Sequence, residues 1–333
     1  MEEFPPKPLD CKLIRESVSV LARIGPGLAH AYVRLDLHDR ELTDISLVAG
    51  YIHLRFLDVS GNHLKDVSPL SPLTALLWLN ADHNALSTVD VDELPYLQTA
   101  FFRDNRLTSL ADISHPTLDT LSLAGQFNTP PSIHSTGRTV SRLQALRVLD
   151  LKDNRLTSTD GLLPPNLEEL YLAGNGLTSV VGLETLPKLR VIHLRSNHIS
   201  CLEGFPRLQV LEYLNLRAND ISDFNQLSHL SHLQRLRVLV LKDNTLVKLD
   251  DYRVQAIAQL IDCSRLRRLD KDTCTNAERR HARAWLREMA EEAAQEEEEE
   301  EEVEEEQVRI YSAVHTILSF VFDISSMLWF SRR

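Results

Sequence analysis

Leucines return along this chain at fixed offsets, and the same set of offsets is repeated through most of its length. The stretch LRVLDLKDNRL at 146–156 comes back almost unchanged as LRVLVLKDNTL at 236–246. Aligned on L-x-x-L-x-L-x-x-N-x-L, the chain holds ten copies at intervals of 22, 22, 21, 21, 28, 21, 22, 22 and 25 residues. Self-similarity at such a period predicts a solenoid, in which each copy is one structural unit stacked on the next.

Each position of the copy has a structural role. The L-x-L core predicts a short strand whose leucines point inward, so that stacked copies form a parallel sheet and bury their leucines jointly. An asparagine follows where the strand turns, because its amide can bond backbone groups that the turn leaves unpaired. These ladder positions are Asn62, Asn84, Asn105, Asn154, Asn175, Asn197, Asn219 and Asn244. Leucines three apart in the second half of each copy predict short helical turns on the convex side.

This motif is that of the leucine-rich repeat. The sequence therefore predicts an α/β leucine-rich repeat solenoid over 31–249, with about ten repeats of ~22 residues, a concave parallel sheet and helical caps at both ends. Two copies depart from the pattern, with Arg40 in the first and Gln126 in the interior. A proline-containing insertion at 127–141 follows Gln126, and we expect weakened ladder continuity there. The insertion is either a tolerated surface loop or a hinge or contact loop.

The segments outside the repeats predict caps and a tail. Residues 1–30 hold an N-terminal segment and a capping helix at 12–24, with Leu13, Leu21 and Ile24 on one face. Residues 250–287 are expected to close the array and to begin a charged helix. An acidic tract at 288–307 and an apolar tail at 308–333 complete the chain.

Charge and cysteine content narrow the class of protein. The formal net charge is −12, and 288–306 hold thirteen glutamates, so the remainder carries −12 + 13 = +1. The four cysteines form no C-x-x-C pair, and the N-terminus lacks a secretory signal, which predicts a reduced protein of the cytoplasm. Ile310–Phe330 is long enough to span a bilayer, although Asp323 and His315 argue against that. An amphipathic helix or a variant C-terminus are the other interpretations.

No enzyme motif, zinc spacing or phosphate-binding loop occurs, so we expect no catalytic residues, no metal and no cofactor. Nucleic acid is not an expected partner, because no continuous basic patch exists. The ligand class that remains is protein. Repeat proteins of this kind bind mainly on the concave sheet, where side chains flanking the inward leucines are presented.

Three columns of side chains are predicted on the concave face. Aromatic residues and arginines, the types that anchor protein interfaces, recur in them. Acidic groups (Asp36, Asp58, Asp82) lie towards the N-terminal half and basic groups (Lys152, Arg195, Arg217, Lys242) towards the C-terminal half. The predicted partner-binding residues are Phe56, Trp78, Phe101, Arg103, Tyr171, His193, Arg195, Tyr213, Arg217 and Lys242. The other interpretation is that these rings pack against cross-strand neighbours.

Several stretches are more specific than the repeat requires, among them GLAHAYV, YIHLR, LLWL, ELPYLQ and ISHP. From about residue 4 to about residue 290 the chain resembles a family of leucine-rich repeat proteins of the radial spokes of motile cilia and sperm flagella. The resemblance implies a non-enzymatic scaffold of the axoneme that supports spoke-head assembly through contacts with spoke head or stalk proteins. It extends neither to the insertion at 127–141 nor to the apolar tail.

Three other classes remain open from the sequence. One is a repeat protein that regulates a phosphatase through its concave face. Another is an acidic-tailed adaptor of basic nuclear proteins. The third is an adaptor anchored in a membrane through 310–330.

Overall fold

The structure, a computed structural model, describes residues 5–25, 29–107, 113–126, 143–159, 164–263 and 265–330. In the last of these ranges the side chains of 296, 313 and 315–330 are not described. The chain forms two compact units, 1–275 and 276–333.

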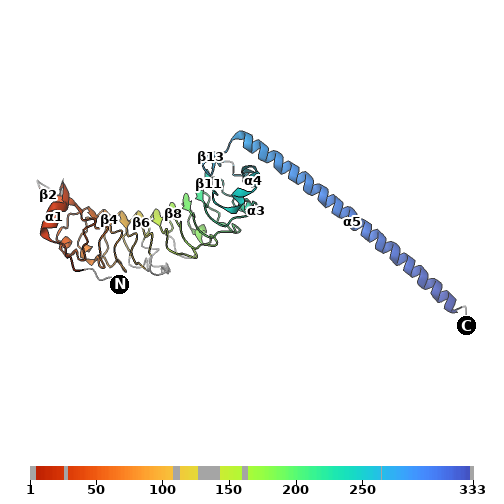
Figure 1. Ribbon diagram of the computed structural model, residues 1–333, viewed down its shortest axis with the longest axis horizontal. Helices are drawn as coiled ribbons and strands as arrows, with labels where there is room; N and C mark the ends of the chain where they lie inside the picture. Colours follow the sequence, from red (N-terminus) through yellow and green to blue (C-terminus); the bar gives the residue numbers. More distant parts are fainter. Residues whose placement is uncertain are drawn as a thin grey trace. The chain divides into compact units, whose positions relative to one another are not determined.

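The first unit is built on one 13-stranded sheet whose strand order follows the sequence (Figure 1). The pairs from β2 to β12 are parallel, and an antiparallel strand lies at each end. The repeat strands are β2 (His30–Asp36), β3 (Phe56–Asp58), β4 (Trp78–Asn80), β5 (Thr99–Phe101), β6 (Thr120–Ser122), β7 (Val148–Asp150), β8 (Glu169–Tyr171), β9 (Val191–His193), β10 (Tyr213–Asn215) and β11 (Val238–Val240). The predicted leucine-rich repeat solenoid is confirmed.

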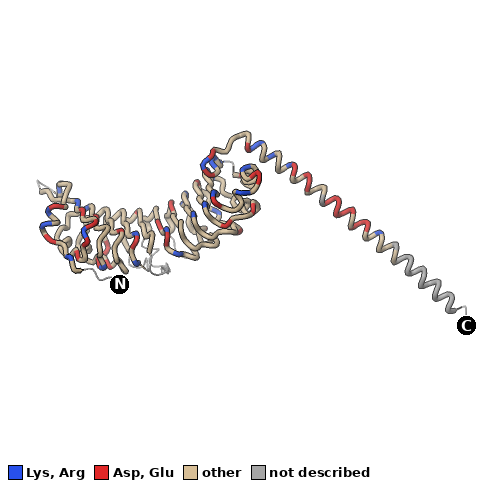
Figure 2. Tube along the Cα trace, in the orientation of Figure 1, with Lys and Arg blue, Asp and Glu red and all other residues tan. Residues whose placement is uncertain are grey.

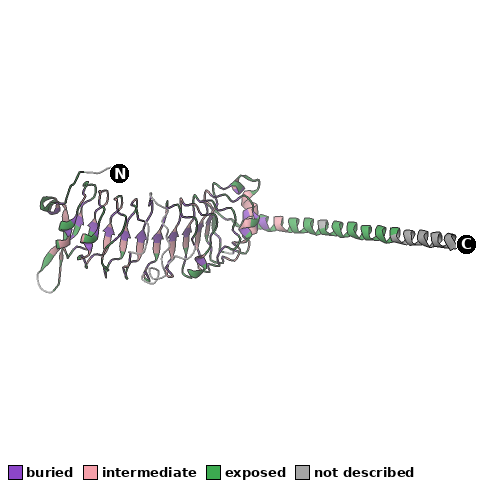
Figure 3. Cartoon of the chain, turned by 90° about the horizontal axis from the view of Figure 1, so that it is seen from below, coloured by how far each residue is buried: buried purple, intermediate pink, exposed green. Residues whose placement is uncertain are grey.

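The core lies behind this sheet and consists mostly of leucine. In β3 the middle residue, Leu57, has no exposed surface, while its two neighbours are at least partly exposed, and most later repeat strands follow this alternation (Figure 3). Alternation arises because successive strand side chains point to opposite faces. Short helices lie on the other side: η1 (Ser46–Gly50), η2 (Ser68–Leu70), η3 (Leu183–Thr185), α3 (Asn225–Ser228) and η4 (Thr245–Lys248).

The N-terminal cap differs from the predicted helix over 12–24. Asp10 accepts a hydrogen bond from the Leu13 amide at 2.7 Å and starts α1 (Cys11–Ser17), whose buried residue is Ile14. From there β1 (Val18–Arg23) pairs antiparallel with β2, so Leu21, predicted on a buried face, is 61% exposed. The prediction was wrong beyond Ser17, because the first repeat strand needs a partner for its open edge.

The C-terminal end of this unit is a mixed cap. Helix α4 (Tyr252–Gln259) is followed by the two-residue strands β12 (Arg268–Leu269) and β13 (Asp272–Thr273), which extend the sheet. Leu266 and Leu269 are buried and complete the core. The predicted helical cap is therefore correct only for α4.

The second unit is one helix, α5 (Asn276–Phe330). It passes without a break through the predicted boundaries at 287/288 and 307/308. None of the helices in the described residues is both long and apolar enough to cross a membrane. Most side chains of the candidate span 310–330, like the whole insertion 127–141, lie outside what the structure describes.

Candidate functional site on the concave face

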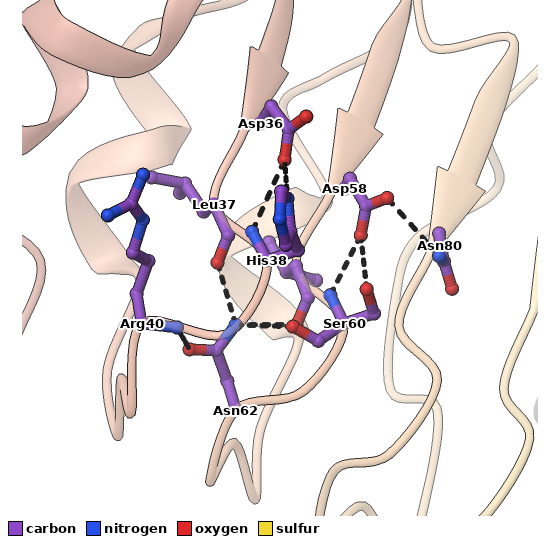
Figure 4. A network of polar contacts seen from close by, with 9 residues as sticks. Asp36, Leu37, His38, Arg40, Asp58, Ser60, Asn62 and Asn80 are labelled. Atoms are coloured by element: carbon purple, nitrogen blue, oxygen red, sulfur yellow. Dashed lines mark hydrogen bonds and ion pairs between the residues drawn. The ribbon is translucent and has the colours of Figure 1, made fainter.

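A ladder of side-chain amides holds each strand against the next. Asn62 shows the pattern (Figure 4): its Oδ1 accepts from the Arg40 and Leu42 amides at 3.1 and 2.9 Å. Its Nδ2 donates to Leu37 O at 2.9 Å, in the preceding repeat, and to Val59 O at 2.8 Å. Buried polar groups of the turns are thus satisfied both within and between repeats. The equivalent amides are Asn84, Asn105, Asn154, Asn175, Asn197, Asn219 and Asn244.

The ladder continues through Gln126, contrary to the expectation of a weakened join. Gln126 Oε1 accepts from the Leu107 amide at 2.9 Å, and its Nε2 donates to Phe102 O at 2.7 Å. The Gln126 amide in turn donates to Asn154 Oδ1 at 3.0 Å, across the insertion. The longer glutamine side chain makes the hydrogen bonds that asparagine makes in the other repeats. Strand β6 pairs with β7 in register across the insertion.

One regularity of the turns escaped the sequence analysis. The residue immediately before every ladder position has a positive φ, between 51° and 70°. Glycine adopts this conformation without strain, and aspartate or asparagine tolerates it better than most residues. Glycine (Gly61, Gly125, Gly174) or aspartate occupies seven of these ten positions, and this enrichment was the available signal; the other three hold His83, Ser196 and Ala218.

Strand register places the predicted columns side by side on the concave face. Phe56 pairs with Trp78, Trp78 with Thr99, and Asn80 with Phe101. The Trp78 and Phe101 rings pack edge to face, with centroids 5.9 Å apart. The two rings form one aromatic wall above β4 and β5, which is a favourable ring arrangement.

A groove of about 490 Å³ opens next to this wall, because the outward side chains of the following strand are small. Its floor is formed by Thr120 and Ser122 of β6, and its far side by Lys152 and Tyr171. Ser122 is 3% exposed, and its hydroxyl has no hydrogen-bond partner among the described residues. An unpaired buried hydroxyl is uncommon in folded proteins.

A second aromatic cluster continues from the far side of the groove. Tyr171 stacks on His193 with centroids 4.7 Å apart, and His193 lies 4.8 Å from the Tyr213 ring. Lys152 Nζ lies 4.6 Å from the Tyr171 centroid, a cation–π contact. Burial, together with the nearby Lys152 charge, lowers the pKa of His193, so the imidazole in this stack is neutral at pH 7.

The charged groups of the face are largely engaged in local contacts. Asp58 accepts from the Ser60 amide and hydroxyl at 3.0 and 2.6 Å (Figure 4). Asp82 accepts from the Arg103 amide at 2.6 Å, while burial raises the pKa of its carboxyl. Asp36 pairs with His38, and this hydrogen bond raises the pKa of His38.

Of the basic residues in the C-terminal half of the face, some form ion pairs and others are exposed. Arg217 pairs with Asp243 at 2.6 Å and Lys152 with Asp150 at 3.4 Å, whereas Arg195 and Lys242 extend into solvent. Trp78, Phe101, Arg103 and Tyr171 thus meet around the groove, and His193 and Tyr213 continue from it. Phe56, Arg195, Arg217 and Lys242 lie outside it. The partner-binding role of all ten residues stays a prediction.

Metal-binding geometry does not occur on this face. Across the described residues no three His, Cys, Asp or Glu side chains gather where they could hold a metal ion. What the face offers is aromatic surface, a groove and exposed cations, which together suit protein binding.

Comparison with known proteins agrees with this architecture. Models of the Leucine Rich repeat family match residues 52–68 and, as two copies, 165–207. Among solved structures, the functional domain of InlJ from Listeria monocytogenes matches with a TM-score of 0.51 and 24% identity, over 72% of this chain and 48% of that one. The TLR13–ssRNA13 complex matches with a TM-score of 0.55 and 21% identity, over 72% and 36%. These two show the fold alone.

Relatives found by sequence are more similar to this chain than these two structures are. Leucine-rich repeat-containing protein 23 from Homo sapiens is 45% identical over 87% of this chain and 83% of its own length. The protein of the same name from Bos taurus is 46% identical over 83% and 79%, and that from Mus musculus is 44% identical over 87% and 84%. With the repeat fold, this indicates a protein-interaction scaffold, and the chain belongs to the leucine-rich repeat-containing protein 23 family.

Proposed function

We propose that this chain is a non-enzymatic scaffold whose concave sheet binds a protein partner, with the groove beside Trp78 and Phe101 as its anchor point. The observation that carries the proposal is the combination, on one open face, of an aromatic wall and a groove floored by small residues. Large apolar rings left open on a surface mark interaction sites. Interface energy is concentrated in such aromatic anchors.

The proposed setting is the radial spoke of motile cilia and sperm flagella, where the chain would support spoke-head assembly and so motility. The support is the resemblance carried by GLAHAYV, LLWL and ELPYLQ together with membership of the family. Its partners would then be spoke head or stalk proteins, and its location the axoneme. The fold by itself specifies neither the partner nor the compartment.

The anchor point is tested by two substitutions and a matched control. Trp78→Ala and Phe101→Ala each remove one ring of the wall, and we expect loss of partner capture from axonemal extracts. Tyr96→Ala removes an aromatic side chain that is 61% exposed and lies outside the three columns, so capture should be unchanged. The unfolding midpoint of all three should stay within a few degrees of the parent. Undiminished capture by both Trp78→Ala and Phe101→Ala would exclude this groove as the site.

The setting is tested by sequential extraction of sperm or ciliated cells. Detergent is applied first and high salt second, and the chain is followed by immunoblotting. A spoke component should remain with the axonemes through detergent. Release by detergent alone would refute the axonemal assignment and would favour a membrane-bound form.

A further inference from the structure

Helix α5 carries a seven-residue pattern along one side. With position a at Leu286, Ala293, Glu300, Gln307 and Val314, position d falls on Met289, Glu296, Val303 and Ile310. Six of these nine positions are apolar, and in the sequence the same positions continue as Ile317, Val321, Ile324 and Leu328. Apolar a and d positions in one helix form a stripe that pairs with a second helix in a coiled coil.

The stripe is partly covered at Leu286 and exposed at its described apolar residues from Met289 onward. Met289 is 39% exposed, Val303 55%, Ile310 56% and Val314 48%, and the same helix is exposed over nearly all of its described length (Figure 3). A helix gains most of its stability by packing an apolar side rather than from its intrinsic propensity. This seam therefore lacks the packing that its sequence pattern predicts.

The flanking positions indicate which kind of helix fits. In a coiled coil the e and g positions border the seam and determine partner choice. An acidic run extends along α5 (Figure 2). Within it, every e and g position from 292 to 306 is glutamate: Glu292, Glu297, Glu299, Glu304 and Glu306. In a parallel pair of identical helices, Glu292 would face Glu297 and Glu299 would face Glu304. Repulsion therefore disfavours a second copy of this chain as the occupant.

The helix itself would gain from a basic neighbour. Within the tract, glutamates recur four residues apart, for example Glu296 with Glu300 and Glu298 with Glu302, and such like-charge pairs destabilise a helix. Arg309 relieves one glutamate, pairing with Glu305 at 3.3 Å. Cations placed along both edges of the seam by a partner would neutralise the rest.

We propose that α5 forms a heteromeric coiled coil with a helix of another protein, one that has an apolar a/d seam and lysine or arginine at its e and g positions. The seam shares no residue with the concave face, so binding at the two can be tested independently. The proposal does not depend on the groove beside Trp78.

The test uses the full-length chain and two synthetic helical peptides of matched heptad length. Both peptides carry isoleucine at a and leucine at d; one has lysine at every e and g position, the other glutamate. Fluorescence anisotropy should show binding of the lysine peptide at least about tenfold tighter than the glutamate peptide, with affinity falling as salt increases. Val303→Asp and Ile310→Asp should each weaken binding of the lysine peptide at least about tenfold.

Val308→Asp is the matched control, because Val308 is 68% exposed on the same helix but lies at position b, outside the seam. It should leave binding within about twofold of the parent. Equal affinity for the two peptides, or an equal loss in Val303→Asp and Val308→Asp, would overturn the proposal. So would a dimer of this chain alone in analytical ultracentrifugation, or sedimentation with phosphatidylcholine vesicles that Ile310→Asp abolishes.

Discussion

His115 should make this solenoid sensitive to mild acid. The side chain is 1% exposed, and its Nδ1 accepts a hydrogen bond from the Leu94 amide at 3.2 Å. Only a neutral imidazole can accept at that nitrogen, and burial lowers the pKa of His115 from 6.5 to about 4. Protonation of Nδ1 in the folded state would turn this acceptor into a donor, so its hydrogen bond with the Leu94 amide would be lost and two N–H groups would face each other.

The sign and size of the effect follow from proton linkage. Between pH 6.5 and 4 the unfolded chain binds a proton at His115 and the folded chain does not, so stability falls as pH falls through this window. A difference of about 2.5 pKa units corresponds to about 3 kcal/mol at most, reached below pH 4. Above pH 6.5 the contribution is constant.

The assay is urea unfolding from pH 7 to pH 4 of the parent and of His115→Asn. Asparagine Oδ1 takes the place of Nδ1 as acceptor for the Leu94 amide and does not titrate. The variant should therefore lose about 2–3 kcal/mol less than the parent between these two pH values, whatever the other carboxylates and histidines contribute to both. Equal losses in the two proteins would refute the reasoning, and hydrogen exchange at the Leu94 amide would locate the effect.

Three further outcomes are expected. Gln126→Ala leaves the buried Leu107 amide without an acceptor, while the Phe102 carbonyl keeps its bond from Asn105 Nδ2, and should cost about 1–3 kcal/mol in urea unfolding. Asn166→Ala removes an exposed bond to Gln144 O and should cost less than about 1 kcal/mol. Gly61→Ala places a Cβ against the Asp39 carboxylate at a residue whose φ is 66°, and it should lower the free energy of unfolding by about 1–2 kcal/mol. Gly50→Ala is the control: the space around Gly50 is open, so the free energy of unfolding should change by less than about 0.5 kcal/mol. Native-state thiol titration should label the exposed Cys11 and Cys201 quickly and the buried Cys263 and Cys274 only on unfolding.

The sequence was informative wherever a residue had to be repeated. Leucines and ladder asparagines must recur in every unit, so their spacing specified the fold, the strands and the columns of the concave face. The N-terminal cap has no such repetition. There Leu13 and Leu21 suit one helical face, but Val18 and Val20 are β-branched, and the open edge of β2 determined the outcome. The local sequence pattern does not show that the open edge of β2 needs a pairing strand.

The groove could not be predicted from the sequence pattern either. Its residues were predicted to share a face, yet the depression arises from a contrast in size between neighbouring strands, large rings at Trp78 and Phe101 beside Thr120 and Ser122. The hydrogen bonds of the acidic groups were also not predictable from the sequence. Asp58 accepts from Ser60, two residues along the chain, and Asp82 accepts from the Arg103 amide of the next repeat.

A division of roles along each repeat explains why a scaffold function suits this chain. The inward leucines and the ladder amides are fixed by packing and by buried hydrogen bonds, so they cannot vary without cost to stability. The outward positions of the same strands are mostly half exposed, and their contacts are local ones between neighbouring strands, such as Trp78 with Phe101. A substitution there should therefore cost less stability than one at an inward leucine. The rings around the groove pack on one another across strands, as the second interpretation of the sequence expected, and they also leave apolar surface open. The proposed binding role rests on that open surface, and the Trp78→Ala and Phe101→Ala variants separate it from packing alone.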